Sequence, residues 1–461
     1  MNDIASILLD KKRNTHLPVF AVTEKTFPDW LKKQPEDVRH GMKNRGFTAK
    51  PGKAVLIPGG VVVGVNTPLS LYDIAPAVDL IGRSFSDEFV RDTSFYLDGI
   101  GAKDIDTAHT GWALACYRFA TYKKSSGQMP SLLWDKKADK KRVTAFAQSI
   151  FMVRDMVNMP ANDMGPEEIE NAAKKLAKTH KAKIDVIRDK ELLTKNFPLV
   201  YAVGQSSPRR PRLIDLSWGN AKHPKVTLVG KGVAFDTGGV NIKPSSNMAL
   251  MKKDMGGAAH VLALGNMIMS LGLKINLRIL IPTVENAVDG YSYRPGDIFK
   301  SRKGITVENT NTDAEGRLIL ADALTYACEG KPELVIDFAT LTGSARAALG
   351  PDIPPAFSNN EKLAEKLRKI SFEAEDPVWP MPLWQPYHKH NDSPNADILN
   401  SSGVPGDLMY SALFLERFLI GKPDWIHLDV YAWEHSGKPG RPRGGADTGL
   451  RAVFALLENL Y

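Results

Sequence analysis

The sequence has few cysteines and no long apolar run. Cys116 and Cys328 are the only cysteines in 461 residues, too few for a disulfide framework, which favours a reducing compartment. The first twenty residues include four charged residues in a row and hold no apolar core of signal-peptide length. No stretch is apolar for long enough to span a bilayer. We therefore expect a cytoplasmic protein without a membrane segment.

Several catalytic signatures are also missing. The sequence contains no His-Glu-x-x-His motif and no paired Cys-x-x-Cys motif, so a metal site built on either pattern is excluded. Neither Gly-x-Ser-x-Gly nor Ser-x-x-Lys occurs, which argues against a serine nucleophile. The net charge of +8 is modest for this length. Its scattered basic residues indicate a solvated surface rather than a nucleic-acid site.

The length favours more than one domain. We predict a small N-terminal α/β domain at residues 1–140, a connecting helix and turn at 141–165, and a larger C-terminal α/β domain at 166–461. In the first block, β-runs flank a Pro-Gly-Gly turn at 58–60, and the residues Trp112–Tyr122 have a helical pattern.

The C-terminal block alternates apolar strand-like runs with helical patterns. Strands are expected at Lys183–Val186, Val226–Val229, Leu277–Ile281, Ile305–Val307, Leu334–Phe338 and Trp425–Val430. Helices are expected at Ala258–Leu271 and Arg317–Ala327. This alternation predicts a mixed, largely parallel central sheet flanked by helices.

Three polar segments follow or precede these elements. The octapeptide Asn311–Leu318 places two acids, a glycine and an arginine on a strand-to-helix turn. Gly230–Gly239 follows another strand, and Met251–Gly257 precedes the helix expected at Ala258–Leu271. Crowded carboxylates at a partly buried turn call for a divalent cation. Taken singly, Asp236 would be a turn residue, Asp254 a surface ion pair, Asp313 a helix N-cap and Met251 a core residue.

Taken together, the segments resemble the leucyl aminopeptidase (cytosol aminopeptidase) family, di-metal exopeptidases with the same octapeptide. The resemblance covers roughly the C-terminal two-thirds of the chain and makes the larger domain the catalytic one. It implies the metal ligands Lys231, Asp236, Asp254, Asp313 and Glu315, with Asp236 and Glu315 bridging the ions. It implies Lys243 and Arg317 as catalytic residues, and Met251, Asn311, Thr340 and Gly343 as substrate-binding residues. The family usually has Leu at the position of Phe338, a departure that concerns packing.

The resemblance also implies cofactors, assembly and activity. We expect two divalent ions per subunit (Mn²⁺ or Zn²⁺, with Mg²⁺ as a third choice), a bicarbonate-like anion at Arg317, and a homohexamer. Lys231 could ligate only as a neutral amine. The predicted activity is release of the N-terminal residue, especially Leu, Met and other apolar residues, from peptides by a metal-activated water. Two alternatives stay open: another di-metal amidohydrolase, or a nucleic-acid-binding scaffold with the same fold.

Overall fold

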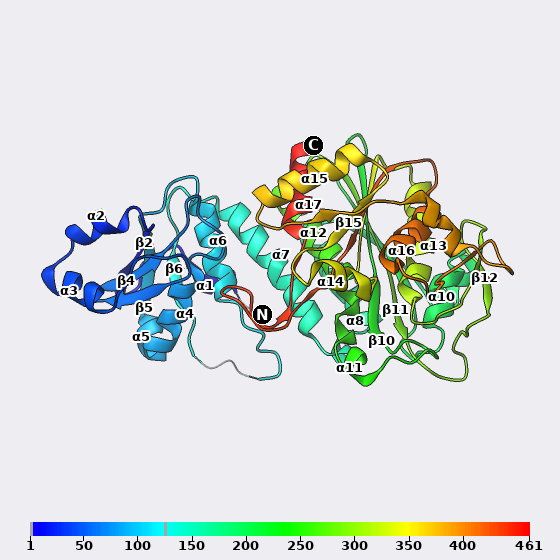
Figure 1. The fold of residues 1–461 in the computed structure, drawn as a ribbon, viewed down its shortest axis with the longest axis horizontal. Coiled ribbons are helices and arrows are strands. Elements are labelled where there is room, and N and C mark those ends of the chain that lie inside the picture. Colours follow the sequence, from blue (N-terminus) through cyan, green and yellow to red (C-terminus); the bar gives the residue numbers. More distant parts are fainter. Residues whose placement is uncertain (1–2, 124–126) are drawn as a thin grey trace. The chain divides into compact units, whose positions relative to one another are not determined.

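The computed structural model describes residues 3–123 and 127–461, which form two compact units (Figure 1). One unit comprises Met1–Phe151 and Glu434–Gly444, and the other comprises Met152–Trp433 and Gly445–Tyr461. The division falls inside helix α7 (Lys140–Asn158). Within the described part of the chain, no helix combines the length and apolar character that a membrane crossing requires.

The N-terminal unit contains a six-stranded sheet in the order β1-β6-β5-β2-β4-β3, parallel except for the β3–β4 hairpin. Apolar side chains from β2, β4 and two helices form a core under one end of this sheet. Its strands are β1 (Leu8–Leu9), β2 (Thr15–Val22), β3 (Ala54–Ile57), β4 (Gly60–Gly64), β5 (Thr93–Asp98) and β6 (Ser131–Leu133). Its helices are α1 (Ile4–Ile7), α2 (Phe27–Lys32), α3 (Glu36–Asn44), α4 (Ala75–Ser84), α5 (Asp87–Asp92) and α6 (Ile105–Ala115).

The helix expected at Trp112–Tyr122 is wrong in position, because α6 begins earlier and ends at Ala115. The guanidinium of Arg118 donates hydrogen bonds to the carbonyl oxygens of Ala115 and Tyr117, at 2.9 and 2.7 Å. A basic side chain that satisfies the last carbonyl groups of a helix stabilises its end. Local periodicity did not reveal this contact.

The C-terminal unit is built on a nine-stranded mixed sheet, in the order β16-β15-β18-β14-β9-β11-β8-β7 with β10 also paired to β11. The central strands are parallel, and the pairs β11–β8, β8–β7 and β15–β18 are antiparallel. This confirms the predicted sheet. Its strands are β7 (Lys183–Arg188), β8 (Arg212–Trp218), β9 (Lys225–Gly230), β10 (Gly232–Asp236), β11 (Asn276–Asn286), β14 (Leu334–Ala339), β15 (Pro355–Ser358), β16 (Trp379–Pro380) and β18 (Asp424–Asp429).

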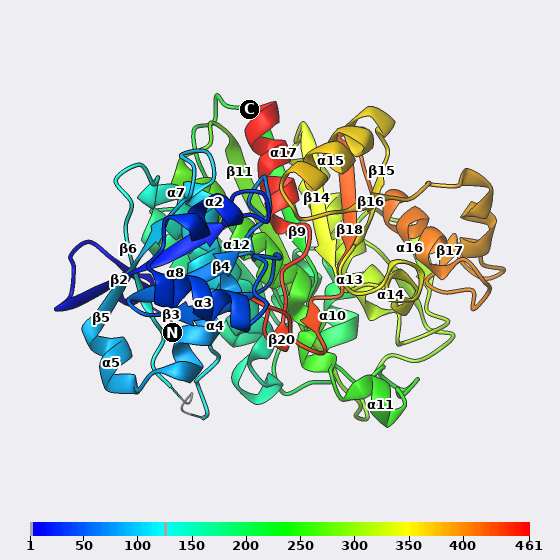
Figure 2. The same cartoon turned by 60° about the vertical axis from the view of Figure 1, so that its left-hand side comes forward.

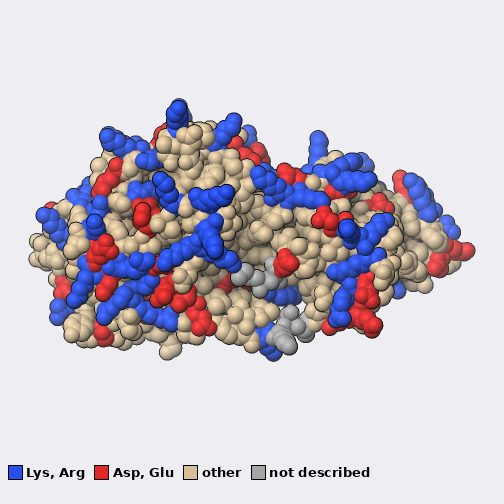
Figure 3. Space-filling model, turned by 180° about the vertical axis from the view of Figure 1, so that it is seen from behind, with Lys and Arg blue, Asp and Glu red and all other residues tan. Residues whose placement is uncertain are grey.

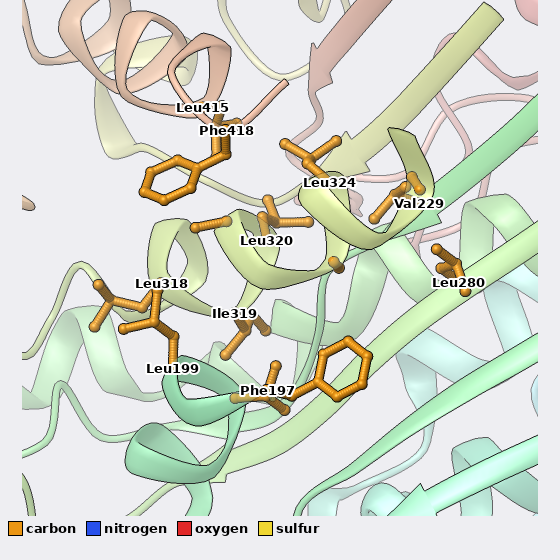
Figure 4. Close-up of a cluster of buried hydrophobic side chains, with 14 of the residues drawn as sticks. Phe197, Leu199, Val229, Leu280, Leu318, Ile319, Leu320, Leu324, Leu415 and Phe418 are labelled. Atoms are coloured by element: carbon orange, nitrogen blue, oxygen red, sulfur yellow. The ribbon is translucent and has the colours of Figure 1, made fainter. Parts of the chain in front are cut away.

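Helices cover both faces of this sheet (Figures 1 and 2). Helix α12 (Gly256–Leu271) packs on β9 and β14 together with α17 (Leu450–Leu460) and α8 (Pro166–His180). On the other face lies α13 (Glu315–Glu329), whose Leu318, Leu320 and Leu324 enter a large apolar cluster (Figure 4). Strand β14 is buried along its whole length, as expected for a strand covered on both faces.

The predicted strand Ile305–Val307 lies outside the main sheet. It corresponds to β13 (Thr306–Glu308), the middle strand of a separate three-stranded sheet with β12 (Ile298–Lys300) and β17 (Ile398–Leu399). The remaining elements are α9 (Glu191–Thr194), α10 (Pro198–Gly204), α11 (Ser245–Met248), α14 (Gly343–Leu349), α15 (Glu361–Glu373), α16 (Asp407–Glu416), β19 (Trp433–Glu434) and β20 (Gly444–Gly445), with 3-10 turns at Ala161–Asp163, Met251–Met255 and Gln385–Asn391.

Candidate metal and catalytic site

Polar residues meet where the parallel strands of the main sheet end. Lys231 follows β9 directly, Asp236 ends β10, Asn286 ends β11, and Thr340 follows β14. The carboxyl ends of neighbouring parallel strands lie at one edge of a sheet, where ligands of open α/β sheets bind. The strand order therefore gathers residues that are more than one hundred positions apart in sequence.

Two further segments bring carboxylates to this edge. Asp254 lies in the 3-10 turn Met251–Met255, Glu315 is the first residue of α13, and Asp313 precedes it by two positions. Carboxylate oxygens of Asp236, Asp313 and Glu315 all lie within 4.8 Å of one another. Asp236, Asp254 and Glu315 are at most 3% exposed. The interpretation of Asp254 taken singly, as part of a surface ion pair, is wrong because the residue is buried.

Lys231 joins two of these acids. Its ammonium nitrogen lies 2.8 Å from Asp254 Oδ2 and 2.9 Å from Glu315 Oε1, and it donates a hydrogen bond of 2.7 Å to the carbonyl oxygen of Thr340. Gly316 leaves room for the Lys231 side chain, since a Cβ at position 316 would lie 2.6 Å from Lys231 Cε. The glycine of the octapeptide is thus explained by close packing.

Lys243 joins the other two acids. Its ammonium nitrogen lies 2.8 Å from Asp236 Oδ2 and also pairs with Asp313 Oδ1. The two lysines therefore divide the four carboxylates between them. Asp313 does not cap α13: the helix has Ala314 at its N-cap position and no side-chain cap bond. The N-cap interpretation of Asp313 is wrong.

Burial and mutual repulsion perturb the acids of this site. Burial, with the negative charge of Asp236, raises the pKa of Glu315 to about 8 and that of Asp313 to about 6. Burial alone would lower the pKa of Lys231, but the carboxylates of Asp254, Glu315 and Asp236 reverse the effect and raise it above its usual range. A group of acids this crowded holds protons unless cations replace them.

The donor set fits divalent ions. Asp254 Oδ2, Asp313 Oδ1 and Glu315 Oε1 are buried, and none accepts a hydrogen bond of good geometry from the described residues, although each lies beside a lysine ammonium group. Buried carboxylate oxygens without hydrogen bonds are costly. Oxygen-rich donor sets suit hard or borderline cations such as Mn²⁺, Mg²⁺ and Zn²⁺. These residues could therefore hold metal ions.

Sequence reasoning missed the groups that hold Asp236 in place. Asn286 donates from Nδ2 to Asp236 Oδ1 at 2.8 Å and to the Thr312 carbonyl oxygen at 3.0 Å. The buried Tyr293 hydroxyl donates to the same carbonyl oxygen at 2.7 Å. Gly238 N–H also donates to Asp236 Oδ1. The position of Asn286 in the sequence, a polar residue after a predicted apolar strand, could have indicated its role in the site.

Arg317 is held by a separate set of contacts. Its Nη1 donates to the Asn400 carbonyl oxygen at 2.6 Å, its Nη2 lies 2.5 Å from Asp407 Oδ1, and the guanidinium stands over the Tyr410 ring. Its Nε is buried and finds no hydrogen-bond partner within residues 3–123 and 127–461. No hydrogen bond or ion pair joins Arg317 to the four acids in that part of the chain. Asp407 and Asn400 were not foreseen.

The four expected substrate-binding residues lie on the segments that carry the acids. Thr340 donates from Oγ1 to Asp254 Oδ1 at 2.8 Å, and Asn311 Oδ1 accepts a hydrogen bond from the backbone of Asp313. Met251 is half-buried at the start of its 3-10 turn, so it is not a closed core residue. Gly343 begins α14 and is exposed.

Comparison with known proteins places this geometry in a family. The model of the cytosol aminopeptidase family catalytic domain matches residues 151–454, and that of the M17 aminopeptidase N-terminal domain matches residues 17–134. The chain belongs to the cytosol aminopeptidase family. The expected resemblance is thereby confirmed, and the second match extends it to the N-terminal third.

Individual members of the cytosol aminopeptidase family are similar over much of their length. A probable cytosol aminopeptidase of Syntrophotalea carbinolica is 42% identical over 321 residues, or 69% of this chain and 64% of that relative. One from Streptomyces griseus is 37% identical over 396 residues, 80% of this chain and 77% of the relative. This chain thus spans less than two thirds of the first relative's length.

Solved structures agree with the fold. The cytosol aminopeptidase from Coxiella burnetii is 42% identical with a TM-score of 0.92, over 98% of this chain and 99% of the other. The bottromycin maturation enzyme BotP in complex with Mn is 29% identical with a TM-score of 0.85, over 96% and 99% of the two chains. The α/β architecture with a mixed, largely parallel sheet is confirmed.

Proposed function

We propose that the protein is a metal-dependent aminopeptidase that releases the N-terminal residue from peptides. The observation that carries this proposal is the meeting of Asp236, Asp254, Asp313 and Glu315 at the strand ends, with two lysines set among them. Membership of the cytosol aminopeptidase family gives the activity its class. Apolar N-terminal residues such as Leu and Met are the proposed substrates.

We assign five residues to two divalent ions: Lys231, Asp236, Asp254, Asp313 and Glu315. When bound, the ions would supply Lewis acidity and a water acidified toward neutral pH. Mn²⁺ or Zn²⁺ is proposed, and the BotP relative, solved in complex with Mn, supports the former. Asp236 and Glu315 are proposed to be shared between the ions, as the family resemblance implies, and together with Asp313 they form a group whose carboxylate oxygens lie within 4.8 Å of one another.

The remaining site residues act on the substrate. The ammonium group of Lys243 would stabilise negative charge on the carbonyl oxygen of the scissile bond. Arg317 is always charged and cannot act as a base. We therefore propose that its positive charge and its Nε, which has no hydrogen-bond partner among the described residues, hold a bicarbonate-like anion that carries a proton. Met251, Asn311, Thr340 and Gly343 would line the site for the N-terminal residue. We also propose that the protein assembles as a homohexamer and is located in the cytoplasm. We place the domain limits at residues 140 and 165.

The test uses aminoacyl-amides with a free α-amine and the same compounds after N-acetylation. Protein stripped by a chelator should be inactive, and reloading with Mn²⁺ or Zn²⁺ should restore cleavage of the free-amine series alone, with two ions counted per chain. An Asp254→Ala variant should lose metal. The matched control is Asp424→Ala. It removes an exposed acid at the first residue of β18, away from the strand ends where the proposed metal ligands meet.

Two outcomes would replace the proposal. Equal cleavage of the acetylated amides would favour another di-metal amidohydrolase. A salt-dependent DNA mobility shift that persists in an Asp313→Ala, Glu315→Ala double variant, without peptidase activity in the parent protein, would favour a nucleic-acid scaffold. Figure 3 shows Lys and Arg interspersed with Asp and Glu on one face.

A further inference from the structure

A basic groove lies in the N-terminal unit, which contains none of the proposed metal ligands. The groove has a volume of about 520 Å³ and is lined by the loop after α3 and the start of β3, including Arg45, Phe47, Lys50, Lys53 and Val55. Its loop wall is fixed: Ala49 is fully buried, and a Cβ on Gly64 would lie 2.4 Å from the Ala49 carbonyl oxygen. The groove is therefore a built feature of this unit.

One side of the groove is the edge of a β-sheet. Strand β3 pairs only with β4 within residues 3–123 and 127–461, through the two-residue turn Pro58-Gly59. Gly64 N–H donates to the Lys53 carbonyl oxygen at 2.9 Å. Because bonding alternates along an antiparallel pair, the backbone groups of Ala54 and Leu56 face away from β4. Arg45 Nη1 bonds the Leu56 carbonyl oxygen at 2.7 Å, which confirms that direction.

The groove combines positively charged side chains with apolar surface. Arg45, Lys50 and Lys53 line it, no acidic residue does, and the two lysines form no ion pair with any residue that the structure describes. Phe47 and Val55 supply apolar surface, half-buried against the core of this end of the sheet. A ligand with alternating acidic and apolar side chains would meet complementary groups.

We propose that this groove binds an extended acidic peptide segment of another protein, which adds to β3 as a further strand. The outward N–H groups of Ala54 and Leu56 and the outward Ala54 carbonyl would pair with the peptide backbone, as in other strand additions. Alternate side chains of a strand point to opposite faces. Lys53 and Val55 lie two positions apart and therefore on the same face. Acidic side chains on that face would meet the lysines, while the side chains between them would lie on the opposite face, beside Ala54 and Leu56.

A peptide fits this site better than a nucleic acid does. A strand edge offers amide donors and acceptors at the spacing of a peptide backbone, and nucleic acid makes no use of that repeat. Non-specific nucleic-acid binding needs many phosphate contacts, whereas this groove offers only three cations. The occupant is thus defined by backbone pairing together with negative charge.

The experiment measures fluorescence anisotropy of the full-length protein with an N-acetylated, C-amidated peptide that alternates Glu with Val. The blocked α-amine prevents cleavage by an aminopeptidase, so failure of the proposed function would not affect this test. We expect saturable binding of this peptide. Lys50→Glu with Lys53→Glu should weaken it about tenfold or more, since attraction becomes repulsion at two positions.

Matched controls separate position from total charge. Lys11→Glu with Lys103→Glu changes the net charge equally at exposed residues outside the groove, and should leave the affinity within about twofold. Ala54→Pro removes one outward N–H without touching the β3–β4 bonds and should weaken binding, whereas Ala54→Ser should not. Circular dichroism checks the folding of each variant.

Three results would overturn the proposal. Equal binding of a single-stranded oligonucleotide of the same charge would show a general polyanion surface. Equal loss in both lysine double variants would show that only net charge matters. Absence of saturable peptide binding would show that the cations serve only to protect an exposed sheet edge from unwanted pairing.

Discussion

Metal loading should release about two protons per chain from the ligating side chains at pH 7, in addition to any proton lost by a metal-bound water. In the metal-free protein, burial and Asp236 raise the pKa of Glu315 to about 8, so this carboxyl is about nine-tenths protonated at pH 7. Lys231 carries its proton because the neighbouring carboxylates raise its pKa. Metal ligation requires an ionised carboxylate and a neutral amine. Each group therefore gives up close to one proton when ions bind.

The sign of the pH dependence follows directly. Protons and metal ions compete for the same groups, so the apparent metal affinity falls as the pH falls. With about two protons released from side chains, the affinity should change at least about 100-fold per pH unit near pH 7. At pH 9 Glu315 is already ionised, given its pKa of about 8, and the release should decline toward the single proton of Lys231. Asp313, with a pKa of about 6, adds little at pH 7.

Titration calorimetry in buffers of different ionisation enthalpy counts these protons. Glu315→Gln should remove close to one proton from the release at pH 7, and Lys231→Met should remove the other. Asp424→Asn changes the exposed acid that begins β18; it is the matched control and should leave the count of the parent protein unchanged. If Lys231→Met binds no metal, the decline between pH 7 and 9 in the parent protein still tests the assignment.

Two results would refute this reasoning. A release below about half a proton per chain at pH 7 would mean that neither group ligates an ion as proposed. An unchanged count in Glu315→Gln that still binds metal would mean that the protons come from elsewhere. Either result would separate the raised pKa of Glu315 from the metal chemistry.

Three further predictions concern catalysis and stability. Lys243→Ala should lower kcat roughly 100-fold with little change in KM, and equal losses in both would contradict a transition-state role. Asp407→Asn deprives Arg317 of its charged partner at 2.5 Å and should lower kcat about tenfold while metal content stays at two ions. Glu170→Gln should lower the free energy of unfolding by about 3 kcal/mol in denaturant titrations, because it leaves the buried Arg212 without its charge partner. Although burial raises the pKa of Glu170, basic neighbours lower it from 4.5 to about 2, so its stabilising effect should be full above pH 4.5 and disappear as the pH falls toward 2.

The sequence predicted those parts of the structure that local pattern and residue order determine. The apolar repeat of α13 and the buried run of β14 predicted both elements to within two residues at each end. The strands that carry Lys231 and Thr340 follow from the same patterns. Placing four acids in one pocket required the family resemblance as well, because each acid alone has a commoner structural explanation.

The parts that stayed hidden depend on tertiary contacts. Asn286 and Asp407 are separated from the groups that they hold by 50 and 90 positions, and no local pattern relates them. The end of α6 depends on the Arg118 side chain. Strand β13 has the composition of a core strand, yet it pairs with β12 and β17, a choice made by the whole fold.

The two lysines explain how such an acidic site folds before metal arrives. Four carboxylates face two ammonium groups, so the metal-free site has an excess of negative charge that burial makes costly. Protonation of Glu315 reduces that excess, which is why its pKa is raised. Two divalent ions would supply enough positive charge to make both the Glu315 proton and the Lys231 proton unnecessary. Proton release on metal binding is therefore the counterpart of the charge balance that lets the metal-free site form.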